Sequence, residues 1–207
     1  MTTETSYRLT VGNLKGGVGR STSAVLIAIE LARITGEHVT LIDADPRNGT
    51  TYGWYEAAQD EWPDNLSVQN IPGTSLARDA AKITGHLVID TGNDATILKQ
   101  ALRATDHLLV PIAPSNNEAA RLTPTLEVAA QVLDVHEFGL SILITRADLR
   151  SKEWIDMRAA LRSELELPVM DAVVSYRATL YGKAYGTVPK KTGTYAQVTT
   201  ELMEAMK

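Results

Sequence analysis

The chain has 207 residues, of which 44% are apolar and 22% charged, and it carries a formal net charge of −5 with no cysteine. This composition excludes a disordered or fibrous chain, and the lack of cysteine excludes disulfides, thiolate metal sites and cysteine nucleophiles. No apolar run approaches the roughly 20 residues of a membrane span, and the polar start has no secretory signal, so we expect a cytoplasmic protein.

Aliphatic segments alternate with helix-length segments along the chain, which is typical of βαβ units with right-handed crossovers. The pattern therefore predicts an α/β fold, a doubly wound and mostly parallel sheet with helices on both faces, in a single domain over residues 1–207. Strands are predicted at Tyr7–Val11, Val39–Ile42, Leu87–Ile89, His107–Val110 and Leu140–Ile144. Helices are predicted at Ser21–Thr35, Leu76–Ile83, Ala95–Ala104, Glu118–His136, Trp154–Glu166 and Tyr195–Met206.

One stretch, Trp54–Pro72, departs from this alternation. We interpret it as a short helix followed by an extended segment near Leu66–Gln69 that returns to the sheet. Large aromatic residues usually bury most of their surface, so we expect Trp54 and Trp62 to cap the edge of the core. A surface that faces a partner is the alternative.

The segment from Asn13 to Thr22, which reads NLKGGVGRST, follows a predicted strand and opens a predicted helix. Glycines allow backbone N–H groups to approach an anion closely, and the start of the helix presents its positive end to the same place. The hydroxyl of Ser21 could then ligate Mg²⁺. The segment predicts a nucleotide-binding phosphate loop, of the P-loop NTPase type, formed by Lys15, Gly16, Gly17, Val18, Gly19, Arg20, Ser21 and Thr22.

Aspartates follow two of the predicted strands. Asp43 and Asp45 end the second strand, and Asp90 ends the third. Ligands of open α/β sheets bind at the carboxyl ends of the strands, where the phosphate loop also begins. These carboxylates should converge with Ser21 on one site, as phosphoryl transfer requires.

Together these motifs resemble those of the ParA/MinD family. The order Lys-Gly-Gly-x-Gly-(basic)-Ser-Thr resembles its deviant Walker A motif, Asp43–Pro46 its Walker A′ motif, and the run that ends at Asp90 its Walker B motif. The likeness continues through Val110–Ser115, Ile142–Arg146 and Tyr176–Pro189. The chain is most similar to small ParA-type plasmid or chromosome partition proteins, because no helix-turn-helix extension precedes the loop.

This resemblance implies ATP and Mg²⁺ as cofactors and assigns roles to the motif residues. Lys15 would reach across a nucleotide-dependent homodimer to the partner's nucleotide, and Asp45 would orient the attacking water. Asp90 would act on Mg²⁺ through a bound water, with Asp43 and Ser21 in the magnesium shell. Thr145 or Arg146 would contact the adenine. The expected catalytic residues are Lys15, Asp45 and Asp90, and the expected metal residues are Ser21, Asp43, Asp45 and Asp90.

The stretch from Asp171 to Tyr195 is locally basic in an acidic chain. Phosphate contacts need only Lys or Arg at the right place, and in the resembled family this region binds DNA non-specifically across the dimer. The expected DNA-binding residues are Arg177, Lys183, Lys190 and Lys191. The resemblance also implies a ParB-like centromere-binding or adaptor protein that stimulates hydrolysis, and a nucleoid-associated location. The acidic C-terminal helix makes a membrane partner unexpected, because anionic lipid attracts polybasic helices.

Two other functions remain open. Arg20 stands where the usual Walker lysine is expected, and arginine is larger, planar and forked. The chain could therefore be a nucleotide-binding, DNA-associated switch with little hydrolysis. An ATP-dependent ligase of the dethiobiotin synthetase type shares the fold and a P-loop, but Lys15 argues against it because that lysine belongs to the dimeric switch proteins.

Overall fold

The computed structural model describes residues 6–45, 47–114, 118–177 and 180–207, with no account of the side chains of residues 118–121. Pro46 and Ser115, which belong to the motifs above, lie outside these ranges. Among the described helices, none combines the length and the apolar character that crossing a membrane requires.

The centre of the fold is one parallel sheet of seven strands in the order β3-β2-β4-β1-β5-β6-β7. The strand order reverses around β1, the first strand, so the chain is wound outward in both directions, and the doubly wound fold predicted from the sequence is confirmed. The strands are β1 (Arg8–Val11), β2 (Val39–Asp43), β3 (Leu66–Asn70), β4 (His86–Asp90), β5 (His107–Ile112), β6 (Gly139–Ala147) and β7 (Val169–Ser175).

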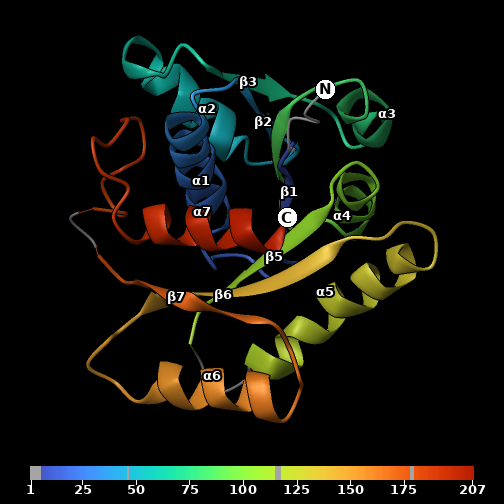
Figure 1. The fold of residues 1–207 in the computed structure, drawn as a ribbon, viewed down its shortest axis with the longest axis vertical. Coiled ribbons are helices and arrows are strands. Elements are labelled where there is room, and N and C mark those ends of the chain that lie inside the picture. The colour runs from blue at the N-terminus through green and yellow to red at the C-terminus, as the bar shows by residue number, and fades with distance from the viewer. Residues whose placement is uncertain (1–5, 46, 115–117, 178–179) are drawn as a thin grey trace.

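Helices cover both faces of the sheet. The helices α1, α2 and α7 pack on one face, while α3, α4 and α5 follow one another along the other face, with α6 beside β6 and β7 (Figure 1). The helices are α1 (Arg20–Thr35), α2 (Thr50–Ala57), α3 (Leu76–Ala80), α4 (Ala95–Leu102), α5 (Glu118–Leu133), α6 (Glu153–Ser163) and α7 (Thr194–Ala205), with a 3-10 turn at Gln59–Glu61. Helix α1 is buried on almost every side because the sheet lies under it and α7 lies over it.

The predicted strands and helices are all present, with ends shifted by a few residues, and two finer expectations are also confirmed. Trp54 and Trp62 are buried at the edge of the core, and Leu66–Asn70 forms a strand. The apolar stripe of α7 packs on α1 and β7. The strand β7 was not predicted. Asp171 interrupts its apolar pattern, and its register against β6 shifts between Val169 and Val173.

A glutamate on α7 compensates for this irregularity in β7. The backbone N–H groups of Asp171 and Ala172 donate to the two carboxylate oxygens of Glu201, at 2.6 and 3.0 Å. These consecutive N–H groups do not both enter the ladder with β6, and unpaired backbone donors are costly when water is excluded. Glu201 therefore holds the edge strand and the last helix together.

We predict that Glu201→Ala lowers the free energy of unfolding by about 1–3 kcal/mol, because two backbone donors lose a charged acceptor. Urea denaturation measures this change. Glu204→Ala is the matched control, since Glu204 is exposed on the same helix. Equal stabilities of the two variants would contradict the role given to Glu201.

Candidate active site

The register of the sheet places two aspartates side by side. Asp43 at the end of β2 lies opposite Asp90 at the end of β4, and Asp90 lies opposite Val11 at the end of β1. Both carboxylates are buried, with 0% and 1% of their surface exposed. The phosphate loop begins directly after β1, so the predicted convergence of loop and carboxylates at one edge of the sheet is present.

The glycines of the loop have the backbone conformation that the motif predicts. Gly17 and Gly19 have φ angles of 77° and 81°, which residues other than glycine rarely adopt. A Cβ atom added at Gly16 or Gly17 would meet nothing within 4 Å, so the loop borders open space. Helix α1 starts at Arg20, and its first three residues border this space, so the positive end of the helix lies where an anion would bind.

This space is a cleft of about 370 Å³, which we call the phosphate cleft. It brings together parts of two predicted motifs, the phosphate loop and the Asp43–Pro46 segment, with Arg146 from the end of β6. Its lining residues are Gly16, Gly17, Gly19, Arg20, Ser21, Thr22, Asp45, Asn48, Thr50, Asn93 and Arg146. Lys15, which is half-buried at the start of the loop, is not among them.

A second cavity of about 250 Å³, the side cavity, adjoins the phosphate cleft and shares Gly19, Thr22 and Arg146 with it. Its remaining walls come from β6, β7, the segment after β7 and α7. They are Thr145, Val174, Ser175, Tyr176, Arg177, Tyr181, Gly182 and Tyr195. Taken together, the two volumes fall in the usual range for small-molecule sites, with a polar end at the loop and an aromatic end at the tyrosines.

Asp90 is the best candidate for holding a divalent cation. Its Oδ2 accepts a hydrogen bond from the Thr51 hydroxyl at 2.8 Å, while its buried Oδ1 accepts none from any described residue. Burial raises the pKa of Asp90 to about 6, although the hydroxyls of Ser21 and Thr51 counteract the rise. A buried carboxylate oxygen without a donor, beside a serine hydroxyl, fits a Mg²⁺ ligand set.

The other two aspartates are already hydrogen-bonded. Asp43 accepts from the N–H groups of Asp45 and Tyr52, at 2.9 and 2.8 Å, and burial raises its pKa above the ordinary value. Burial alone would also raise the pKa of Asp45, but donors on Asn48 and the N–H of Arg47 hold it below the ordinary value. Asp43 thus organises the turn into α2, and Asp45 remains ionised at the border of the cleft.

Thr51 is a site residue that the sequence analysis missed. It is fully buried in the first turn of α2 and fixes one oxygen of Asp90. A hydroxyl residue soon after the Asp-x-Asp-Pro motif was the available signal, but its partner lies 39 positions further along the chain.

Arg20 lies under the loop. Its Nη1 donates to the carbonyl oxygens of Asn13 and Lys15, the latter at 3.0 Å. Burial lowers its pKa, against the opposing effect of the charges on Asp90 and Asp45. Its buried Nε has no acceptor among the described residues. Part of the guanidinium therefore braces the loop, and part borders the cleft.

The end of β6 holds the loop from the other side. The Thr145 hydroxyl donates to the carbonyl oxygens of Val18 and Ile112, at 2.8 and 2.9 Å. Arg146 donates to the carbonyl of Gly17 at 2.6 Å and adopts a φ of 55°, a strained value typical of functional sites. Both residues border the side cavity, where the sequence predicted them to contact a base.

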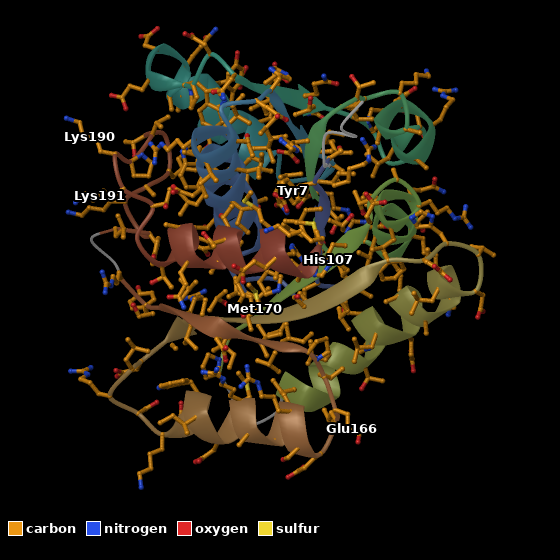
Figure 2. All side chains as sticks on the ribbon, viewed as in Figure 1. Tyr7, His107, Glu166, Met170, Lys190 and Lys191 are labelled. Atoms are coloured by element: carbon orange, nitrogen blue, oxygen red, sulfur yellow. The ribbon has the colours of Figure 1, made fainter. Side chains whose placement is uncertain are left out.

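The four basic residues expected to bind DNA lie in two different places. Arg177 lines the side cavity, and its Nε donates to the Ser175 hydroxyl at 3.1 Å. Lys183, Lys190 and Lys191 are exposed in the segment between β7 and α7. Figure 2 shows Lys190 and Lys191 pointing away from the body of the molecule.

Comparisons with known proteins show what the chain is similar to. A family model described as an AAA domain matches residues 7–80. The chain is 33% identical over 181 residues to the maintenance of carboxysome distribution protein A of Gloeobacter kilaueensis, covering 80% of this chain and 76% of that protein. It is 27% identical to protein ParA of Rhizobium radiobacter, covering 73% and 70%. A cobyrinic acid a,c-diamide synthase from Mycobacterium smegmatis has the same fold, with a TM-score of 0.76, 18% identity and coverage of 96% and 95%.

The fold and the loop thus define a P-loop protein with a parallel sheet and a cleft at the carboxyl ends of its strands. Within this class, the similarity to these relatives and the lysine directly before the double glycine, Lys15, identify the family. The chain belongs to the ParA/MinD family of P-loop ATPases.

We predict that Asp90→Asn raises the free energy of unfolding in the absence of Mg²⁺ and nucleotide. The folded pKa, about 6, lies above the ordinary 3.8, so the folded state holds an extra proton between these values, and this stability is lost as the pH rises through about 6. The gain from the variant should be small near pH 4 and about 2–3 kcal/mol near pH 8.

Urea denaturation across this pH range measures the difference. Asp64→Asn, at an exposed position, is the control for the removal of one carboxylate. A gain from Asp90→Asn that stays constant with pH would contradict the buried, proton-binding carboxylate.

Proposed function

We propose that this protein is a ParA-type ATPase that binds ATP and Mg²⁺, dimerises in the nucleotide-bound state, binds DNA non-specifically and positions a cargo. The observation that carries the proposal is the cleft in which the glycine loop, Ser21 and the carboxylate of Asp45 meet. The buried carboxylate of Asp90 lies next to this cleft, beside the Ser21 hydroxyl. Its mixture of backbone donors and carboxylates suits a nucleoside triphosphate with its metal ion.

Among the described residues, no group of three or more histidine or acidic side chains could hold a metal ion. A magnesium ion at Asp90 and Ser21 would therefore take further oxygen ligands from bound phosphate and water, as this ion commonly does. The structural neighbour from Mycobacterium smegmatis was solved with an ATP analogue and magnesium, which supports this pairing for the fold.

The roles of the residues follow from their positions. The N–H groups of the loop and the start of α1 would bind the phosphates, and the bound Mg²⁺ would neutralise the charge that develops there. Asp45, ionised at the border of the cleft, would orient the attacking water. Lys15, outside the cleft of its own subunit, would contact the phosphates of the partner subunit.

A direct structural connection between the carboxylates and the basic segment supports a nucleotide-switched DNA contact. The first turn of α2 is hydrogen-bonded to Asp43 and Asp90. In the same helix, buried Trp54 donates from Nε1 to the carbonyl of Thr187 at 2.8 Å, and its ring lies 5.8 Å from that of Tyr185. A shift of α2 on metal binding would therefore reach the segment that carries the three lysines.

The cargo follows from the relatives only in outline. One relative is named for carboxysome distribution and the other is named ParA, like the partition proteins that the sequence resembles, so the proposed cargo is DNA or a large protein body. A ParB-like or other adaptor protein would connect the cargo to the ATPase, and the DNA contact would place the protein on the nucleoid.

A switch with little hydrolysis is the second candidate, favoured by the contacts of Arg20. Its Nη1 is engaged with loop carbonyls, so the guanidinium has less freedom to follow the phosphate during transfer. The ligase alternative gains nothing from the diamide synthase, because 18% identity supports the fold alone.

We predict weak ATP hydrolysis that increases with non-specific DNA and falls at least about 100-fold in Asp45→Ala, because the water loses its orienting base. Phosphate release with and without DNA measures this. If the wild type has no turnover and Arg20→Lys restores it, the switch is the correct function. If neither protein binds ATP, the nucleotide site itself is wrong.

We predict that replacing Lys190 and Lys191 by alanine weakens ATP-dependent DNA binding and lowers the salt dependence by about one phosphate contact per lysine. Fluorescence anisotropy at several salt concentrations measures both. Lys152→Ala, at an exposed position beside α6, is the control. Unchanged affinity and slope would remove this segment from the DNA contact, and Arg177→Ala would then separate a DNA role from a nucleotide role.

A further inference from the structure

A buried polar junction connects α5 to the start of the phosphate loop. Asn13, only 1% exposed, donates from Nδ2 to the carbonyl of Pro111 at 2.8 Å. Its Oδ1 accepts from the backbone N–H of Lys15 at 2.9 Å and from the Thr125 hydroxyl at 3.3 Å. The side chain of Asn13 therefore joins β5, α5 and the first turn of the loop.

Thr125 makes two contacts to the loop with one hydroxyl group. It accepts from the backbone N–H of Leu14 at 3.1 Å and donates to Asn13, and the side chain is fully buried. A threonine within a helix often bonds to its own helix backbone, but this hydroxyl is used across the fold. It is a contact through which α5 holds the loop.

As a result, the backbone of Lys15 is fixed at both of its polar groups. Its N–H donates to Asn13, and its carbonyl accepts from Arg20. The direction in which a side chain leaves the backbone follows from the backbone dihedral angles, so these contacts determine where the lysine can reach. Glycine follows at positions 16 and 17, and the backbone there has no comparable stiffness of its own.

We propose that Thr125 is a positioning residue that acts through Asn13 to direct Lys15 toward the nucleotide of the partner subunit. This inference rests on the proposed function, in which Lys15 acts across the dimer. The residues that line the phosphate cleft of the same subunit begin at Gly16, so ATP or ADP binding by a single subunit does not depend on this junction.

The test uses Thr125→Val, which keeps the shape but removes the hydroxyl, and Thr125→Ser, which keeps the hydroxyl. We expect Thr125→Val to bind ADP within about twofold of the wild type and to lose at least about tenfold in ATP-dependent dimerisation and in kcat. Lys15 acts only across the dimer in this proposal, so a misdirected Lys15 weakens the dimer contact and slows the reaction without affecting ADP binding by one subunit. Thr125→Ser should behave as the wild type in all three measurements.

Amide hydrogen exchange of the nucleotide-free protein gives an independent measurement. Leu14 and Lys15 should exchange faster in Thr125→Val than in the wild type, and at the wild-type rate in Thr125→Ser. Wild-type exchange in Thr125→Val, or an equal loss of ADP binding and dimerisation, would overturn the inference. If the wild type itself fails to dimerise with ATP, the proposed function fails, whereas faster exchange would still establish the junction as the restraint on Lys15.

Discussion

The active site depends on the burial of two carboxylates at the ends of adjacent parallel strands. A buried carboxylate is costly unless it is paired, and Asp43 offsets part of this cost by accepting two backbone hydrogen bonds. Asp90 offsets less of it, because one of its oxygens has no donor among the described residues, and burial raises its pKa to about 6. Such an arrangement destabilises the empty protein, and a cation in the place of the missing donor would remove this cost.

The loop opposite these carboxylates is held from several directions before any ligand arrives. Side chains from the end of β6 and from Arg20 within the loop engage its carbonyl oxygens. These carbonyls are therefore bonded within the protein and do not compete for the N–H groups that an anion in the cleft would need. A site organised in this way loses less conformational entropy on binding, which is the physical advantage of pre-organisation.

The sequence could predict what is encoded locally. The glycine pattern, the aspartates at strand ends and the alternation of elements each lie within a few neighbouring residues, so the fold and the cleft could be predicted from them. The residues that complete the site could not. Thr51 contacts Asp90, which lies 39 positions away in the sequence, and Thr125 contacts Leu14, which lies 111 positions away. Glu201 accepts a hydrogen bond from β7, a strand whose apolar pattern is interrupted by Asp171. Such contacts depend on tertiary packing, which the hydrophobic periodicity of the sequence does not reveal.

Arg20 connects the phosphate loop with the carboxylates of the site. A lysine at this position would present one compact charge, but the planar guanidinium can bond loop carbonyls with one nitrogen while its charge remains near Asp45 and Asp90. It thus contributes both to the bracing of the loop and to the balance of charge around the carboxylates. Since Arg20 and Asn13 hold opposite sides of the Lys15 backbone, the substitution that departs from the family pattern also bears on the lysine that defines the family. Arg20 therefore bears on two places at once, the cleft of its own subunit and the backbone from which the Lys15 side chain extends.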